Sequence, residues 1–495
     1  MSTNDTTAEH SRPAPELEQP TPELKSEKLG LFAVIMPGVA QISPGGSLFF
    51  VAAAMASLAG ASVPLIFLVS MIGMIATSVS LALFSSIWPS AGSFVTYTAR
   101  AIGVRTATAI GAITVIGYVI LFGGLYIYIG SYIVHNFLGD PHVTGITQIV
   151  TVVYGAAIVV PVILGLRFGM RATIALFLFE AAIVIGLAIA VLGRGGTGGL
   201  SAEPFHWPHG SGATNILSVF SLAFLAFAGF EAAAPLAEEA DRPRRNVPIA
   251  LLSSVIISGL LYIFGSYALV TAFGMHNING LATDSNPFHT AAKQFFPLLA
   301  PLVNIMFLSS MTSGLIAAST QTSRVIFAGA RGGLWPHKLS TLSRFGTPAV
   351  AAIAFVVPSV LIGVASTLFA SPVDASGLLT TFGTVGAVCM YLAANVALVV
   401  QWFRLRRTGV RKNPLLWVAT PIIGIAVLAI AIWGDLRPGQ PSPYNTLPWL
   451  TIALIVFGIA YTAILGAVRP HVLKSAPTLL EGPSASNAGA EAVSA

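Results

Sequence analysis

Long apolar runs are the feature that most constrains what this 495-residue chain can fold into. Twelve windows of about 20 residues or more hold almost no charged side chain, and each is long enough to cross a bilayer as a helix. Only 8% of the residues are charged, against about 25% in soluble domains. Because a backbone in lipid must satisfy its own hydrogen bonds, the sequence predicts an all-α polytopic membrane protein.

The same composition excludes several classes of protein. An ordinary soluble enzyme, a disordered protein and a nucleic-acid-binding protein all need far more charge, and the strands of an outer-membrane barrel alternate apolar with polar residues. The twelve predicted helices cover residues 29–57, 61–88, 104–137, 146–166, 170–193, 214–240, 246–274, 296–330, 347–369, 373–402, 413–433 and 446–468.

Lysine and arginine predict how these helices are oriented. With the N-terminus placed inside, only Arg194, Lys293 and Arg437 of the 24 basic residues fall outside. Positive charge gathers on cytoplasmic loops, so the net charge of +6 indicates topology and not nucleic-acid binding. We therefore expect a protein of the cytoplasmic (inner) membrane with both termini in the cytoplasm. Its predicted parts are a disordered N-terminal tail at 1–28, a twelve-helix transmembrane domain at 29–468 and a C-terminal tail at 469–495.

Two of the predicted helices are interrupted. The first contains residues 42–47 (ISPGGS) near its middle, where a proline removes a backbone donor and two glycines make unwinding inexpensive. The sixth contains residues 227–231 (FAGFE), with a glycine and a carboxylate in an apolar run. Breaks at matching positions of two five-helix halves predict an inverted-repeat transporter, although a packing kink explains either break alone.

Broken helices suit a zwitterionic ligand. The N-terminus of a half-helix presents free N–H groups and a positive partial charge, which favour a carboxylate, and its C-terminal counterpart presents free carbonyls, which favour an ammonium group. Two breaks that face each other at the bilayer midplane would therefore bind both ends of an amino acid.

Four passages give the chain its family resemblance. They are residues 89–97 (PSAGSFVTY), 227–231, 239–248 (EADRPRRNVP), and the group of Ser323-Arg324, 331–336 (RGGLWP) and Thr347-Pro348. Together they resemble the bacterial amino acid permeases of the amino acid–polyamine–organocation superfamily, over roughly residues 29 to 468. The resemblance implies ten helices in a 5+5 inverted repeat, as in the bacterial leucine transporter, plus two C-terminal helices.

The resemblance also implies where substrate would bind. The N–H groups of Gly45, Gly46 and Ser47 would take the substrate carboxylate, although Ser43-Pro44-Gly45-Gly46-Ser47 departs from the family's usual glycine–serine–glycine stretch. The carbonyls at the breaks would take the amino group, and two phenylalanines would form an aromatic lid. The expected substrate-binding residues are Ile42, Ser43, Gly45, Gly46, Ser47, Tyr118, Phe227, Ala228 and Phe230.

Two acidic residues, Glu180 and Glu231, lie deep in predicted helices, where a charge is costly and indicates function. Glu231 follows the sixth-helix break, so it either takes part in gating or protonation or satisfies freed backbone N–H groups.

Glu180 stands about where some relatives carry a lysine in place of a sodium ion. An apolar surrounding favours its protonated form, so it could couple transport to protons, or it could simply bond a neighbouring hydroxyl.

The sequence thus predicts a secondary active transporter of amino acids that works by alternating access and is coupled to protons, with symport and antiport both open. An exchanger or antiporter of polyamines or other small amines remains the alternative within transport. A membrane-embedded transferase is the alternative of another class, and it lacks a polar catalytic cluster. We expect no enzyme activity, cofactor or metal site: there is no P-loop, one cysteine and no metal-type histidine spacing. The expected partners are a small substrate, a proton or counter-transported solute and lipid.

Overall fold

A computed structural model describes residue 24 and residues 28–139, 143, 145–208, 212–470 and 472–473. The predicted tails at 1–28 and 469–495 lie almost entirely outside these residues. Leu24 is described, and it is buried in a small cluster with Ala91 and Phe327. The predicted tail boundaries therefore stay predictions.

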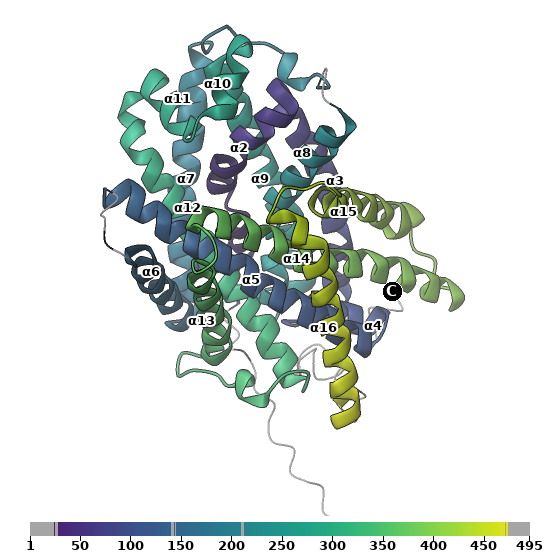
Figure 1. Cartoon of the computed structure of the whole chain (residues 1–495). Coiled ribbons are helices and arrows are strands. Elements are labelled where there is room, and N and C mark those ends of the chain that lie inside the picture. The colour runs from purple at the N-terminus through teal and green to yellow at the C-terminus, as the bar shows by residue number, and fades with distance from the viewer. Residues whose placement is uncertain are drawn as a thin grey trace, which may run out of the picture.

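The described chain is helical, with no β-strand and one isolated bridge between Leu29 and Ala240. Figure 1 shows the helices packed as one bundle. The α-helices are α1 (Leu31–Ile42), α2 (Pro44–Ala59), α3 (Val63–Ile87), α4 (Phe94–Ala101), α5 (Val104–Phe137), α6 (Ile146–Ile163), α7 (Leu166–Gly193), α8 (Ala213–Ala226), α9 (Pro243–Phe273), α10 (Ile278–Thr283), α11 (Pro287–Phe295), α12 (Ala300–Arg331), α13 (Ala349–Ser366), α14 (Pro372–Arg407), α15 (Thr420–Leu436) and α16 (Leu447–Val468).

The prediction of a polytopic membrane protein is confirmed. Eleven helical stretches in the described residues are long and apolar enough to cross a membrane. The first stretch, Leu31–Ile87, has 57 residues. At 1.5 Å per residue a helix of this length would measure about 85 Å, enough for two passages through a hydrocarbon core of about 30 Å. The stretches are thus compatible with twelve passages, and the count of twelve stays a prediction.

The break in the first predicted helix is narrower than expected. Helix α1 ends at Ile42 and α2 begins at Pro44, so Ser43 is the one residue between them, with a left-handed backbone (φ 54°). Gly45 and Gly46 belong to the first turn of α2 and are not unwound. The physical reason is Pro44, whose missing N–H costs nothing at the first position of a helix, where that group has no intrahelical partner.

The break in the sixth predicted helix is wider. Helix α8 ends at Ala226, residues 227–229 form a turn, and the 3₁₀ helix η3 (Phe230–Leu236) continues the chain. Gly229 has φ 118°, a backbone angle that residues with a Cβ atom rarely adopt. A built Cβ there would lie 2.9 Å from the backbone carbon of Gln41 and from the nitrogen of Ile42. The turn therefore needs glycine for both its backbone angle and its contact with α1.

The two broken helices lie against each other in opposite directions. Helix α1 packs on η3, and α2 packs on α8, so the first half of each broken helix contacts the second half of the other. Helix α12 contacts both halves of the first one. This arrangement brings the break at Ser43 and the break at 227–229 into one region, as expected for the inverted-repeat transporter fold.

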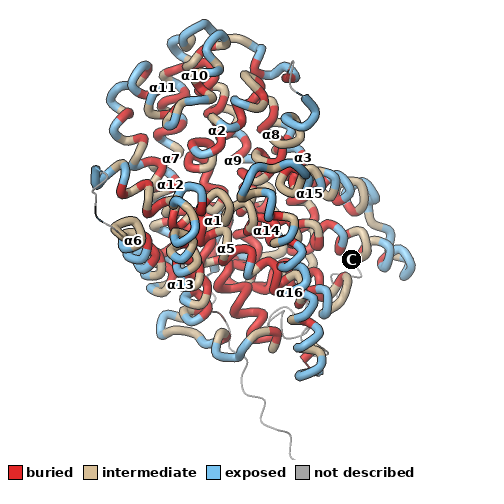
Figure 2. The backbone as a smooth tube through the Cα atoms, viewed as in Figure 1, coloured by how far each residue is buried: buried red, intermediate tan, exposed pale blue. Residues whose placement is uncertain are grey.

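Helices α5 and α14 cross this region at close range. A Cβ on Gly117 would lie 2.8 Å from the Cα of Gly386 and 2.9 Å from the carbonyl oxygen of Gly383, so only glycine lets the two backbones approach this closely. The contact matters because the next residue of α5 is Tyr118, which points toward the breaks. Figure 2 shows the buried residues gathered around these central helices. The outer faces of α6 and α16 are exposed and apolar, as expected for surfaces in contact with lipid.

Candidate substrate site

A cavity of about 450 Å³ lies between the two breaks and the crossing helices. This volume is typical of small-molecule sites. The cavity begins at Gln41 and Gly314 and extends along α5, α8 and α14 to the loop between α15 and α16, at Arg437 and Tyr444. Its middle is mainly apolar, lined by Val51, Leu121, Phe122, Leu125, Leu222, Leu225, Phe307, Met311 and Leu315.

Six of the nine residues expected to bind substrate line this cavity: Ile42, Ser43, Gly46, Ser47, Tyr118 and Ala228. The other three do not. Gly45 faces Glu180 of α7, Phe227 packs edge-on against Tyr262, and Phe230 stacks on Tyr391 with ring centroids 5.2 Å apart. The structure therefore places the two phenylalanines behind the cavity wall, with no exposed ring surface, and not as a lid over the cavity.

The expected carboxylate donors all have partners within the chain. The N–H of Gly45 donates to Glu180 Oε1 at 3.3 Å, and that of Gly46 donates to Ser310 Oγ at 2.8 Å. The N–H of Ser47 donates to the Ser43 carbonyl at 2.7 Å, as in a regular helix. A substrate carboxylate at this turn would have to displace Ser310 Oγ or share its donor. The narrow break explains this outcome, since it frees fewer N–H groups than a long unwound stretch would.

The carbonyls at the breaks are more available. The Ile42 carbonyl, beside the cavity, accepts one hydrogen bond, from Ser47 Oγ at 2.8 Å, and keeps a second lone pair. The carbonyls of Phe227 and Ala228 accept no hydrogen bond from the described residues, and Ala228 lines the cavity. We call the part of the cavity lined by Ile42, Gly46 and Ala228 its deep end. The deep end offers acceptors for an ammonium group more readily than it offers donors for a carboxylate.

Glu231 is held by five donors from five separate segments. Its oxygens accept from the N–H of Gly229 at 3.0 Å, the hydroxyl of Tyr391 at 2.5 Å, the hydroxyl of Tyr118, and the amides of Gln41 and Gln321, both at 3.4 Å. The carboxylate is buried and does not line the cavity, but Tyr118, Gln41 and Gly229 do. This geometry favours the structural interpretation: Glu231 ties both breaks to α5, α12 and α14.

Replacing Glu231 by glutamine is expected to lower stability without removing any coupling between transport and protons. The amide would point a donor toward groups that already donate, and an unsatisfied buried donor costs about 1–3 kcal/mol. The thermal unfolding midpoint of the purified protein should fall, and transport should slow. A variant with wild-type stability but no response to a pH gradient would instead give Glu231 the protonation role.

Glu180 of α7 lies behind the first break. One carboxylate oxygen accepts from Gly45, and the other, Oε2, is buried and accepts no hydrogen bond from the described residues. Ser310 of α12 is close by, since it accepts from Gly46 and its carbonyl accepts from Ser43 Oγ at 2.6 Å. Glu180 therefore connects α7 to the same turn of α2 that α12 contacts, and one of its two carboxylate oxygens has no partner among the described residues.

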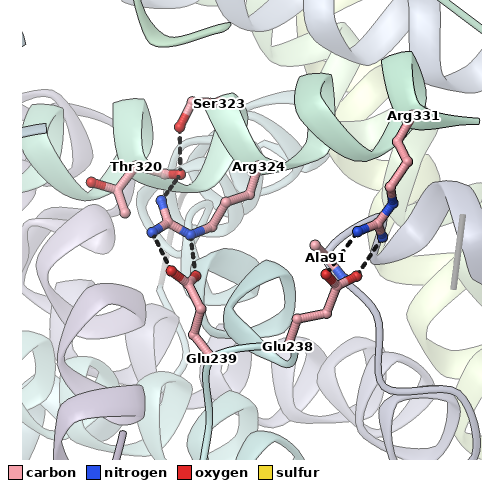
Figure 3. A network of polar contacts seen from close by, with 7 residues as sticks. All are labelled: Ala91, Glu238, Glu239, Thr320, Ser323, Arg324 and Arg331. Atoms are coloured by element: carbon pink, nitrogen blue, oxygen red, sulfur yellow. Dashed lines mark hydrogen bonds and ion pairs between the residues drawn. The ribbon is translucent and has the colours of Figure 1, made fainter. Parts of the chain in front are cut away.

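Two buried ion pairs lie beyond the floor of the cavity, and Figure 3 shows them side by side. Arg324 donates twice to Glu239, at 2.5 and 2.9 Å, and Arg331 donates twice to Glu238, at 2.6 and 3.0 Å. Glu238 also accepts from the N–H of Ala91. We call these two pairs the Arg–Glu clamp. It joins the last turns of α12 to the segment after η3, which also pairs with Leu29 before α1.

The clamp lies beyond the end of the cavity that Gly314 lines. Gly314 and Leu315 of α12 line the cavity, and Arg324 is nine residues further along, about 14 Å at 1.5 Å per residue. In the sequence, Glu239, Arg324 and Arg331 belong to the passages that resemble the family, and no role was predicted for them. The available signal was a pair of arginines, Arg324 and Arg331, near the end of one predicted helix, together with two adjacent glutamates after a broken helix.

A third acidic residue was missed. Only Glu180 and Glu231 were expected deep in helices, but α15 extends to Leu436, past the predicted end at 433, and includes Asp435. Asp435 lines the cavity together with Arg437. Asp435 is near a helix end and next to a loop with proline and glycine. A hydropathy window averages over that loop and therefore does not assign Asp435 to the helix.

Comparison with known proteins agrees with this architecture. A family model described as "Amino acid permease" matches residues 29–460. The chain is 26% identical over 457 residues to the branched-chain amino acid permease BcaP of Bacillus subtilis (strain 168), covering 88% of this chain and 92% of the relative. It is 23% identical over 447 residues to the low-affinity putrescine importer PlaP of Escherichia coli (strain K12), covering 86% and 92%.

A shorter match covers the D-serine/D-alanine/glycine transporter of Escherichia coli (strain K12), with 25% identity over 271 residues, 52% of this chain and 56% of the relative. These relatives are transporters and not enzymes. Together with the membrane-length helices, they make this chain a multi-pass membrane protein related to carriers of amino acids and amines. The predicted family is confirmed over most of the chain: the protein belongs to the amino acid permease family.

Proposed function

We propose that this protein is a secondary active transporter that carries amino acids across the cytoplasmic membrane by alternating access. The observation that carries the proposal is the cavity between two facing helix breaks, which extends toward the α15–α16 loop at one end. The Arg–Glu clamp lies beyond the other end, further along α12, and would close the path there. Both termini would be cytoplasmic, which puts the clamp inside and the loop outside. The structure would then be outward-facing, and inward release would require the clamp to open.

The lining supports a substrate with an apolar side chain. Leucine and phenylalanine residues of α5 and α8 surround the middle of the cavity, and burying an apolar side chain there gains about 25 cal/mol per Å². The substrate's ammonium group would bind the carbonyls of Ile42 and Ala228. Similarity to a branched-chain amino acid permease supports the same class of substrate.

The direct test is tracer flux in proteoliposomes of the full chain, with a panel of neutral, cationic and anionic amino acids and of amines. Uptake of neutral apolar amino acids supports the proposal. Flux of amines alone would support the second candidate, an amine carrier. The specific observation that favours this alternative is the shortage of free N–H donors at the deep end of the cavity, together with the similarity to a putrescine importer.

We further propose that Glu180 couples transport to protons. Its carboxylate accepts the N–H of Gly45 in the first turn of α2, so adding a proton weakens this acceptor and loosens α7 from the first break. Loading and release of a proton would thereby change the same turn that lines the substrate cavity.

Replacing Glu180 by glutamine is expected to abolish accumulation driven by an imposed pH gradient, while exchange of labelled for unlabelled substrate continues. Glutamine keeps the shape but cannot exchange a proton at neutral pH. The matched control is Glu203→Gln, which removes an exposed carboxylate outside the helices that line the cavity. Gradient-driven accumulation by Glu180→Gln at the wild-type level would rule out this coupling role.

A further inference from the structure

The outer part of the cavity contains charges that the deep part lacks. Among its lining residues, Asp435 and Arg437 are the two that carry a carboxyl group and a guanidinium group. They stand two residues apart, where α15 ends and the chain turns into the loop before α16. Both are half-buried, so solvent screens them less than it screens a surface pair.

The structure holds Asp435 in place. Ser221 of α8 donates to its carboxylate at 3.4 Å and to the carbonyl of Ala431 at 2.7 Å, which ties α15 to the half-helix before the second break. Gln440 donates to the carbonyls of Gly434 and Asp435, at 3.1 and 3.3 Å, and folds the loop back over the end of α15.

Arg437, in contrast, has unused donors. Its guanidinium makes no hydrogen bond and no ion pair with any residue in the part of the chain that the structure describes. An arginine offers five N–H donors in a planar fork that matches a carboxylate. A guanidinium group with unused donors and a carboxyl group with one weak partner, both on the cavity wall, complement a small molecule that carries a carboxylate and an ammonium group.

We propose that Asp435 and Arg437 form an outer subsite that binds a zwitterionic amino acid before it reaches the helix breaks. The carboxylate would bind Arg437, and the ammonium group would bind Asp435. This inference rests on the proposed function and deepens it. It supplies the carboxylate partner that the N–H groups of Gly45, Gly46 and Ser47 do not offer in this conformation.

The outer subsite predicts a two-step entry. The substrate would bind first by its charged ends near the α15–α16 loop and then pass along the apolar wall, so that its ammonium group exchanges Asp435 for the carbonyls at the breaks. Recognition of the carboxylate would thus precede recognition of the side chain.

The test combines equilibrium binding of labelled leucine to the purified full-length protein with flux in proteoliposomes. In Arg437→Gln, the affinity for leucine is expected to fall about tenfold, the loss of one charge-assisted hydrogen bond. Leucinamide, which lacks the carboxylate, should compete equally well with wild type and variant. In Asp435→Asn, the affinity for leucine should fall, whereas 2-hydroxy-4-methylpentanoate, which lacks the ammonium group, should compete unchanged.

The control is Arg194→Gln, which removes a positive charge on the same predicted side of the membrane but outside the cavity lining. Unchanged leucine affinity in Arg437→Gln, or equal losses for leucine and leucinamide, would overturn the subsite while leaving transport intact. Conversely, leucine binding that depends on Arg437, with no flux in wild type, would support the subsite and refute the proposed function.

Discussion

Gly229→Ala is expected to abolish transport and to prevent most of the protein from reaching the membrane in folded form. The residue has φ 118°, where a side chain costs about 1–3 kcal/mol. In addition, the new Cβ would lie 2.9 Å from backbone atoms of Gln41 and Ile42, closer than real Cβ contacts. Relief would require α1 and the turn after α8 to separate, which would pull apart both breaks and the donors of Glu231.

The matched control is Gly60→Ala. Gly60 also has a positive φ, 60°, but a Cβ there meets no atom within 4 Å. This variant should lose about 1–3 kcal/mol from backbone strain alone and keep transport near the wild-type level. Yield of folded protein by size-exclusion chromatography and initial rates of uptake measure both variants. Equal behaviour of the two would mean that the turn at Gly229 can relax, and that the close approach of the breaks is not essential.

Arg324→Ala is expected to produce the second large effect. Arg324 and Glu239 are both buried, and breaking a buried ion pair by removing one partner costs about 3–5 kcal/mol. Because the pair joins α12 to the segment after η3, its loss should also weaken the closed end of the cavity. The thermal unfolding midpoint should fall sharply, and uptake should be nearly lost.

Two further variants separate the charge from the position. The swapped double variant Arg324→Glu, Glu239→Arg restores opposite charges and should recover part of the stability that either single change removes. Arg344→Ala removes an exposed arginine beyond the same end of α12 and should leave the unfolding midpoint unchanged. Full stability of Arg324→Ala would show that Glu239 is accommodated without its partner and that the clamp does not hold this end closed.

The overall architecture could be predicted because it depends on local properties of the chain. Runs of apolar residues determine which segments enter a bilayer, and prolines and glycines determine where a helix can break. Both breaks were therefore located within a few residues from the sequence. The exact register was not, since the choice between an unwound stretch at 42–47 and a single non-helical residue at Ser43 depends on whether Pro44 starts a new helix against α12 and α7.

The site could be predicted only in part. Six of the nine expected residues line the cavity because they belong to the breaks or to α5, which faces them. Phe227 and Phe230 belong to the second break as well, but their direction depends on packing against Tyr262 and Tyr391, residues of other helices. The sequence contained no information on which side of the cavity wall these two rings would lie.

The sequence by itself determined a helical membrane protein with two interrupted helices, two acidic residues in unusual places and the signature of amino acid permeases. Only the tertiary structure decided what those acids contact, that the N–H groups of the first break are already bonded, and that Asp435 and Arg437 reach the cavity. The physical reason is the range of the interactions. Hydropathy and backbone preference act over a few residues, whereas the partners of Glu231, Arg324 and Asp435 lie up to 214 positions away along the chain. Such contacts exist only after the helices have packed.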